Sequence, residues 1–351
     1  MNNLELRLQN IAATTARRQI PSCDWDLYAD AIIAERRAIE ADIARTDPPT
    51  AETRRMVDHF RRTGFLQMPL AIDPSYRQVL LNYLNRQPAY AGPHIFSAGG
   101  ARRPISELMK VSQFACYSTD QLLRAPNLID FFNSPAIIDI VECYLGCVPT
   151  LYSVNAWWSF PAAAPEAENA QYFHRDNDDW RFCTLFVYLT DVDAESGPHQ
   201  MIERSHTESG MDRLLAKARE RGRNTGDFTA RGSFFSHFGT EFSATCEQLF
   251  DDDISTVTGP AGSAFLVNTV AMHRGLVPRS KPRLMLWARY GLGSNSNSAD
   301  LEQGPTSHVL AATAMKATPR RRFINRLLLD FDRGPYFASQ APQDTSKIEI
   351  A

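Results

Sequence analysis

The sequence contains little of what disulfide-rich, membrane-spanning or secreted proteins need. Six cysteines in 351 residues are too few for a disulfide scaffold, and no two of them form a Cys-x-x-Cys pair, so we expect reduced thiols. No apolar run approaches the roughly 18 residues that cross a bilayer, and the N-terminal residues lack the apolar segment of a secretory signal. These absences predict a cytoplasmic protein without a membrane segment.

A large excess of charge of either sign is also missing. The chain has 37 Lys and Arg against 40 Asp and Glu, a net charge of −3, which argues against the basic surface that nucleic-acid binding requires. Hydrophobic residues at 44% and charged residues at 22% are ordinary globular values and exclude wholesale disorder. Because the net charge is close to zero, the protein as a whole creates no strong electrostatic field that could select a partner. Selection must then depend on local pocket residues, and this favours a small-molecule substrate.

The pattern of apolar residues divides the chain into a helical part and a strand-rich part. Residues 1–63 have helix-like spacing and are predicted to form an N-terminal arm. Residues 64–292 contain many short β-branched and aromatic segments separated by Gly and Pro turns, which indicates an antiparallel sandwich or jelly roll. Within it, the charged segment 207–252 is predicted to be a helical insertion that could cover a site. Residues 293–351 are predicted to be a polar tail with one short helix near residues 323–331.

The segment around residue 174 carries the pattern that points to chemistry. In an extended chain, residues i and i+2 point to the same side, so the imidazole of His174 and the carboxylate of Asp176 can bind one ion. His273, in a predicted late strand, supplies a third donor. Two histidines and one carboxylate form the facial triad of non-haem Fe(II) oxygenases, which leaves positions open for a co-substrate and O₂.

An arginine at the start of the next predicted strand extends this interpretation. A 2-oxo acid bound to iron has a distal carboxylate, and a guanidinium binds such a group through two parallel hydrogen bonds. Alternation along the strand puts Arg283 and Trp287 on one face and Leu284 on the other. We therefore expect Arg283 to point inward toward a co-substrate. The alternative is a surface cation that follows Lys281 and Pro282.

Four blocks of sequence, in order along the chain, carry a recognisable pattern: residues 173–179, residues 185–193, residues 196–199 with 204–206, and residues 273–284. Together they resemble the phytanoyl-CoA dioxygenase-like family of Fe(II)/2-oxoglutarate-dependent oxygenases. The resemblance implies a mainly β fold with flanking helices, built on a double-stranded β-helix (a cupin-like jelly roll).

The resemblance also implies roles for individual residues. His174, Asp176 and His273 would hold Fe(II), Arg283 would bind the C5 carboxylate of 2-oxoglutarate, and Thr184 would offer a hydroxyl to the co-substrate. The implied enzyme uses O₂, releases succinate and CO₂, and hydroxylates an unactivated C–H bond of a small molecule. An aspartate at position 176 favours hydroxylation over halogenation, because a small residue there would free a metal position for halide.

The residues leave two other functions open. One is a cupin-like metal enzyme that does not use 2-oxoglutarate, which would not need Arg283. The other is a non-catalytic jelly-roll binding module, which would tolerate loss of His273. Neighbouring His199 and His206 are predicted to have structural roles and not to bind the metal. The helical arm offers a surface for a homodimer, so the oligomeric state stays open, as does the identity of the substrate.

Overall fold

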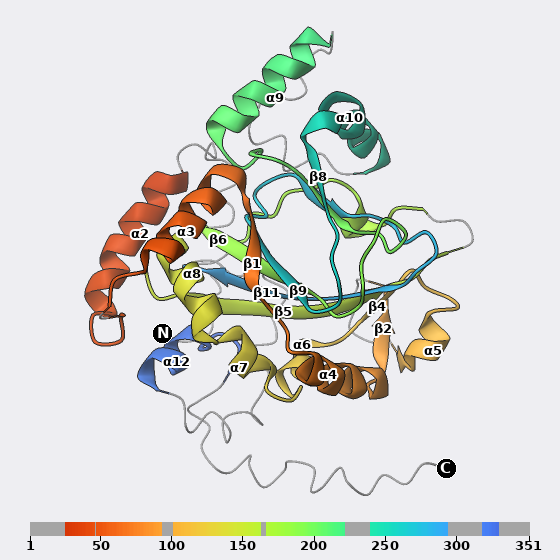
Figure 1. Cartoon of the computed structure of the whole chain (residues 1–351), viewed down its shortest axis with the longest axis horizontal. Helices are drawn as coiled ribbons and strands as arrows, with labels where there is room; N and C mark the ends of the chain where they lie inside the picture. Colours follow the sequence, from red (N-terminus) through yellow and green to blue (C-terminus); the bar gives the residue numbers. More distant parts are fainter. Residues whose placement is uncertain are drawn as a thin grey trace, which may run out of the picture.

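The computed structural model describes residues 25–45, 47–92, 101–162, 166–221, 239–293 and 318–329. These residues form two antiparallel sheets surrounded by helices (Figure 1). The large sheet has eight strands in the order β1 (Phe65–Ala71), β9 (Ser263–Val267), β6 (Phe182–Tyr188), β11 (Arg283–Gly291), β5 (Thr150–Ser159), β4 (Phe114–Cys116), β2 (Ala89–Ala91) and β3 (Arg102–Arg103). The small sheet has three strands in the order β10 (His273–Gly275), β7 (His199–Ile202) and β8 (Ile254–Val257).

Helices precede, interrupt and follow the strands. Ahead of β5 lie α2 (Trp25–Ile39), α3 (Ala51–Thr63), α4 (Pro74–Arg86), α5 (Ile105–Leu108), α6 (Thr119–Leu123), α7 (Leu128–Phe132) and α8 (Pro135–Leu145). After it come the short 3₁₀ helix η2 (Asn169–Gln171), then α9 (Glu208–Glu220), α10 (Thr240–Phe250), η5 (Asp251–Asp253) and α12 (Pro319–Ile324). Within the described residues, no helix is both long enough and apolar enough to cross a membrane.

The two faces of the large sheet are covered by different layers. Alternation along β11 sends Leu284 and Leu286 to the outer face, where they share one apolar core with residues of α2, α3 and α8. Trp287 and Met285 point the other way and pack with Phe186, other large-sheet residues and residues of the small sheet. We call this space between the two sheets the barrel interior. The predicted double-stranded β-helix with flanking helices is therefore confirmed.

Among the described residues, the predicted arm contains α2 and α3, and the predicted tail contains one short helix. In the arm, Thr50 caps α3 by accepting a hydrogen bond from the backbone N–H of Thr53 at 3.0 Å. In the tail, α12 begins earlier than predicted, because Thr318 caps it and Pro319 fits its first turn, and residues 325–329 of the predicted helix form turns and a bridge instead. Residues 1–24, 222–238, 294–317 and 330–351 of the predicted arm, insertion and tail lie outside the described residues. The domain boundaries stay a prediction.

The loop after β7 is held against the arm by a histidine. His206 Nε2 donates to the backbone oxygen of Arg61 at 3.0 Å, and its Nδ1 is buried without a hydrogen-bond partner. Gly64 allows this contact, because it has a φ of 79° and a Cβ there would lie 2.7 Å from that Nδ1. Burial lowers the pKa of His206 to about 4. The structural role predicted for this residue agrees with these contacts.

The lowered pKa of His206 predicts a loss of stability in mild acid. Between about pH 6.5 and pH 4 the unfolded chain protonates this histidine and the folded chain does not, so the free energy of unfolding falls as the pH drops. The slope contributed by one such group reaches about 1.4 kcal/mol per pH unit. In urea unfolding at about pH 7 and pH 5, His206→Gln should lose less stability than the wild type. An equal loss in both proteins would show that His206 does not cause the effect.

Candidate metal centre

The backbone brings the three predicted ligands to one place. His174 and His273 exchange two main-chain hydrogen bonds, of 3.0 and 2.9 Å, so the two residues face each other as an antiparallel pair. The N–H of Asp176 donates to the backbone oxygen of Thr269 at 2.8 Å, which holds the loop after His174 beside the chain leading to β10. His273 opens β10 as expected, whereas His174 forms an isolated bridge and Asp176 lies in a loop.

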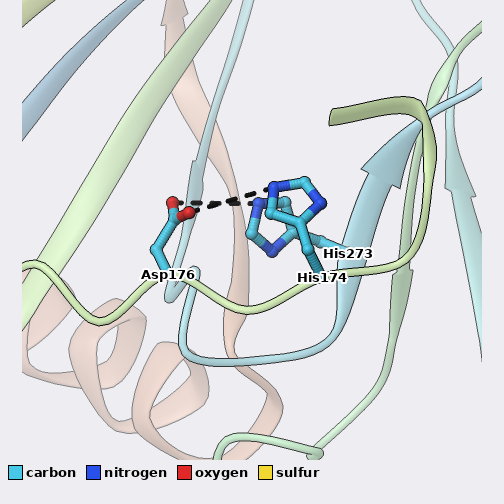
Figure 2. A group of neighbouring side chains, drawn as sticks. All are labelled: His174, Asp176 and His273. Atoms are coloured by element: carbon cyan, nitrogen blue, oxygen red, sulfur yellow. Dashed lines mark ion pairs between the residues drawn. The ribbon is translucent and has the colours of Figure 1, made fainter. Parts of the chain in front are cut away.

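The three side chains converge at the edge of the barrel interior (Figure 2). His174 Nε2 and His273 Nε2 each lie 3.9 Å from an oxygen of the Asp176 carboxylate. One donor atom from each of the three residues lies within 4.8 Å of the other two, and among the described residues no other group of three or more such side chains does so. A single ion placed between them can reach all three donors.

The protonation of the two histidines suits a metal. His174 Nδ1 lies 2.8 Å from the backbone oxygen of Tyr172, and His273 Nδ1 lies 2.9 Å from that of Ala271. A carbonyl oxygen only accepts hydrogen bonds, so each Nδ1 carries a proton and Nε2 is the ring atom left to bind a metal. Burial, followed by the neighbouring His174, lowers the pKa of His273 to about 3, which keeps that ring neutral.

The carboxylate ligand is held in its charged form. Burial opposes ionisation of Asp176, but the positive charge of Arg289 on β11 and a hydrogen bond from Thr269 favour the charged form, and the pKa of this carboxyl lies below its usual value. Arg289 Nη2 is 3.6 Å from Asp176 Oδ2, and Arg289 Nε is 3.4 Å from Asp178 Oδ2. Two neutral imidazoles and one carboxylate are the donor set of a non-haem Fe(II) site, so these residues fit that ion.

Arg289 is expected to contribute to metal affinity through Asp176. Arg289→Leu removes the positive charge beside the carboxylate and frees Asp176 to turn away from the two imidazoles. Loss of a partner that orients a ligand typically weakens metal binding by roughly 10- to 100-fold. Titration with Mn²⁺ would measure this loss, with Arg279→Leu, an arginine on an exposed turn, as the control. Equal affinity in the two variants would rule out the role of Arg289.

Arg283 lies inside the protein, as its strand parity predicts. It is 3% exposed, and its Nη2 donates to Ser159 Oγ at 3.3 Å, while Nε and Nη1 have no hydrogen-bond partner. The guanidinium packs against Gly275 of β10, where a Cβ would lie 2.8 Å from Nη2. A buried cation with unpaired donors is costly unless an anion joins it. A carboxylate is the anion that a guanidinium binds through two parallel hydrogen bonds.

Thr184 also points into the barrel interior, from β6. It is fully buried, and its Oγ1 lies 3.3 Å from Oγ1 of Thr269, the residue whose hydroxyl hydrogen-bonds Asp176. This contact places Thr184 behind the carboxylate ligand. Its predicted contact with the co-substrate stays a prediction.

His199 stands much closer to the centre than its predicted structural role suggests. It lies on β7 and is 2% exposed. Its ring stacks on that of His273, with the centroids 5.6 Å apart, and its centroid lies 4.9 Å from that of the tilted Phe186 ring. Its Nε2 has no partner, and burial holds its pKa well below the usual value. The indole N–H groups of Trp157 and Trp287 are likewise buried without partners. Strand alternation in β7 was the signal that could have placed His199 inside.

Comparison with known proteins gives a family and several distant structures. The family model described as phytanoyl-CoA dioxygenase (PhyH) matches residues 101–283, just over half of the chain. No curated protein sequence matches the chain. Similar solved structures include EctD from S. alaskensis with bound Fe, at 15% identity and a TM-score of 0.44, covering 70% of this chain and 78% of that one.

Two further structures are similar at the same level. The epimerase SnoN in complex with Fe³⁺, alpha ketoglutarate and nogalamycin RO has 18% identity and a TM-score of 0.43, covering 69% of this chain and 84% of that one. HygX from Streptomyces hygroscopicus, with nickel and 2-oxoglutarate bound, has 17% identity and a TM-score of 0.41, covering 68% and 86%. The family match decides the classification: the chain belongs to the phytanoyl-CoA dioxygenase family of Fe(II)/2-oxoglutarate-dependent oxygenases.

Proposed function

We propose that this oxygenase hydroxylates an unactivated C–H bond of a small molecule and releases succinate and CO₂. The observation that carries the proposal is the combination of a triad of metal donors, His174, Asp176 and His273, with a buried Arg283 guanidinium whose Nε and Nη1 have no hydrogen-bond partner. The triad supplies the ligands that Fe(II) prefers, and the arginine supplies the cation that the distal carboxylate of 2-oxoglutarate requires.

The metal ligands, Arg283 and the aromatic side chains of the barrel interior have separate roles in the proposed reaction. When bound, Fe(II) and 2-oxoglutarate supply the oxidising chemistry. His174, Asp176 and His273 would hold the metal on one side and leave the other side open, and Arg283 would orient the co-substrate through its C5 carboxylate. Phe186 and other aromatic side chains of the barrel interior exclude water from the reacting atoms.

The identity of the residue at position 176 distinguishes hydroxylation from halogenation of the substrate. With Asp176 as a ligand, no metal position is left for a halide beside the co-substrate, so transfer of oxygen to the substrate is favoured over halogenation. The same centre also serves other oxidations when the substrate is placed differently, and one similar structure is that of an epimerase. We favour hydroxylation as the simplest outcome for a substrate held near the open metal positions.

The two alternative functions, a metal enzyme that does not use 2-oxoglutarate and a non-catalytic binding module, place different demands on Arg283 and His273. A metal enzyme without 2-oxoglutarate has no need of a buried guanidinium with two unpaired nitrogen atoms, Nε and Nη1. A non-catalytic binding module has no need of two oriented imidazoles around an ionised carboxylate. Both features cost free energy in the absence of a bound group, and this cost supports the oxygenase.

A screen for succinate release tests the proposal. Fe(II)-loaded protein with 2-oxoglutarate and O₂ is incubated with a broad panel of metabolites, and His174→Ala is the control. We expect at least one metabolite to raise succinate formation in the wild type alone, with a product that has gained one oxygen atom. A product that has lost two hydrogens, or has the same mass as the substrate, would replace hydroxylation by desaturation, cyclisation or epimerisation. Succinate formation that is equal in the control would contradict the proposal.

A further inference from the structure

The peptide group between Tyr172 and Phe173 is hydrogen-bonded at both ends. Its carbonyl oxygen accepts from Nδ1 of His174 at 2.8 Å, and its N–H donates to Oγ of Ser243 on α10 at 2.8 Å. A peptide unit is planar and rigid, so a hydrogen bond that fixes its N–H also fixes the direction of its carbonyl. The Ser243 hydroxyl is thereby connected to the orientation of the His174 ring.

The peptide group between Ala271 and Met272 repeats this arrangement at the other histidine. Its carbonyl oxygen lies 2.9 Å from Nδ1 of His273, and its N–H donates to Oγ of Ser205 at 2.7 Å. Ser205 is fully buried, and its own hydroxyl proton is donated to the backbone oxygen of Ile202 at 2.7 Å. Because the Ser205 hydroxyl proton is donated to Ile202, the Ser205 oxygen can accept the hydrogen bond from the backbone N–H of Met272.

We propose that Ser205 and Ser243 are positioning residues that aim the two histidine ligands at the metal. Each hydroxyl fixes one peptide plane, and the carbonyl of that plane accepts a hydrogen bond from Nδ1–H of the histidine two residues further along the chain. The Nε2 lone pairs of His174 and His273 then point at the same place without the metal. The inference rests on the proposed metal site and adds residues that lie outside it.

The packing of α10 supports this role for Ser243. Phe173 is fully buried in a small apolar core together with Met272 and with Cys246 and Leu249 of α10. The helix therefore packs against the residue that precedes each histidine ligand. Glu247 of the same helix lies 2.6 Å from Arg274, the residue that follows His273. The predicted helical insertion therefore contributes to the wall of the metal centre through α10.

The clearest test compares metal affinity among serine variants of the full chain. Ser205→Ala and Ser243→Ala should each weaken Mn²⁺ binding about tenfold, measured by electron paramagnetic resonance, and the double variant should weaken it further. Ser205→Thr and Ser243→Thr keep the hydroxyl oxygen and should stay within about threefold of the wild type. Ser196→Ala is the matched control, because Ser196 is equally buried and bonds Asp193 in a turn that contacts neither histidine.

Melting temperatures of the metal-free proteins separate positioning from simple stabilisation. If Ser205→Ala and Ser243→Ala lower the melting temperature as Ser196→Ala does but bind Mn²⁺ like the wild type, the positioning role is wrong while the metal site stands. Failure of the wild type itself to bind Mn²⁺ would instead overturn the proposed metal site. Weaker binding in both alanine variants, with recovery in the threonine variants, is the result that we expect.

Discussion

Replacing His273 by alanine is expected to abolish Fe(II) binding and 2-oxoglutarate turnover together. The change removes one of three donors from a centre in which each imidazole is already oriented by a hydrogen bond from its Nδ1 to a backbone oxygen. Removing a residue that only orients a ligand costs roughly 10- to 100-fold in affinity, so removal of the ligand itself should exceed that range. The backbone bonds between His174 and His273 do not need the imidazole, so the barrel should persist.

Two measurements on His273→Ala check this result. Titration with Mn²⁺ gives the metal affinity, and succinate formation gives the turnover. His59→Ala, an exposed histidine on α3, is the control for the loss of a histidine elsewhere. Metal affinity within about threefold of the wild type in His273→Ala would remove this residue from the metal site and would favour the non-catalytic binding module.

Replacing Arg283 by methionine is expected to separate co-substrate binding from stability. Loss of one partner of a buried, hydrogen-bonded charge pair costs about 2–5 kcal/mol, so 2-oxoglutarate should bind roughly 30-fold more weakly or worse. Without 2-oxoglutarate, however, Arg283 is a buried cation whose Nε and Nη1 have no partner. An apolar side chain of similar length should therefore leave the metal-free protein as stable as the wild type, or more stable.

Calorimetric titration and thermal unfolding test the two halves of this expectation. Titration of the Mn²⁺-loaded protein with 2-oxoglutarate under exclusion of O₂ gives the affinity, and unfolding of the metal-free protein gives the stability. Lys281→Met, which removes a surface cation that pairs with Asp193, is the matched control. Unchanged affinity in Arg283→Met would favour a metal enzyme that does not use 2-oxoglutarate. A large loss of stability would show that Arg283 has structural partners of its own.

Local patterns in the sequence are enough to predict the centre of the site. The His-x-Asp spacing and a histidine in a late predicted strand select the three side chains that the structure brings together, although only His273 lies in a strand. Alternation along β11 correctly sends Arg283 and Trp287 inward and Leu284 outward, because one face of that strand packs on helices and the other on the small sheet.

The residues around those donors could not be predicted in the same way. Arg289 reaches Asp176, and Ser243 reaches Phe173, only because β11 and α10 are folded against the segment that carries the ligands. No spacing rule connects residues so far apart in the sequence. The sequence predicts a structural role for His199 but not its position on β7, where its ring stacks on that of His273.

Binding of 2-oxoglutarate to the Fe(II)-loaded protein, followed by visible absorption spectroscopy without O₂, decides whether His174, Asp176, His273 and Arg283 form one working site. We predict that 2-oxoglutarate produces a saturable absorption change in the wild type. The same change should require much higher concentrations in Arg283→Met and should be absent in His273→Ala. A wild-type protein that binds Fe(II) but shows no spectral response to 2-oxoglutarate would contradict the proposed function.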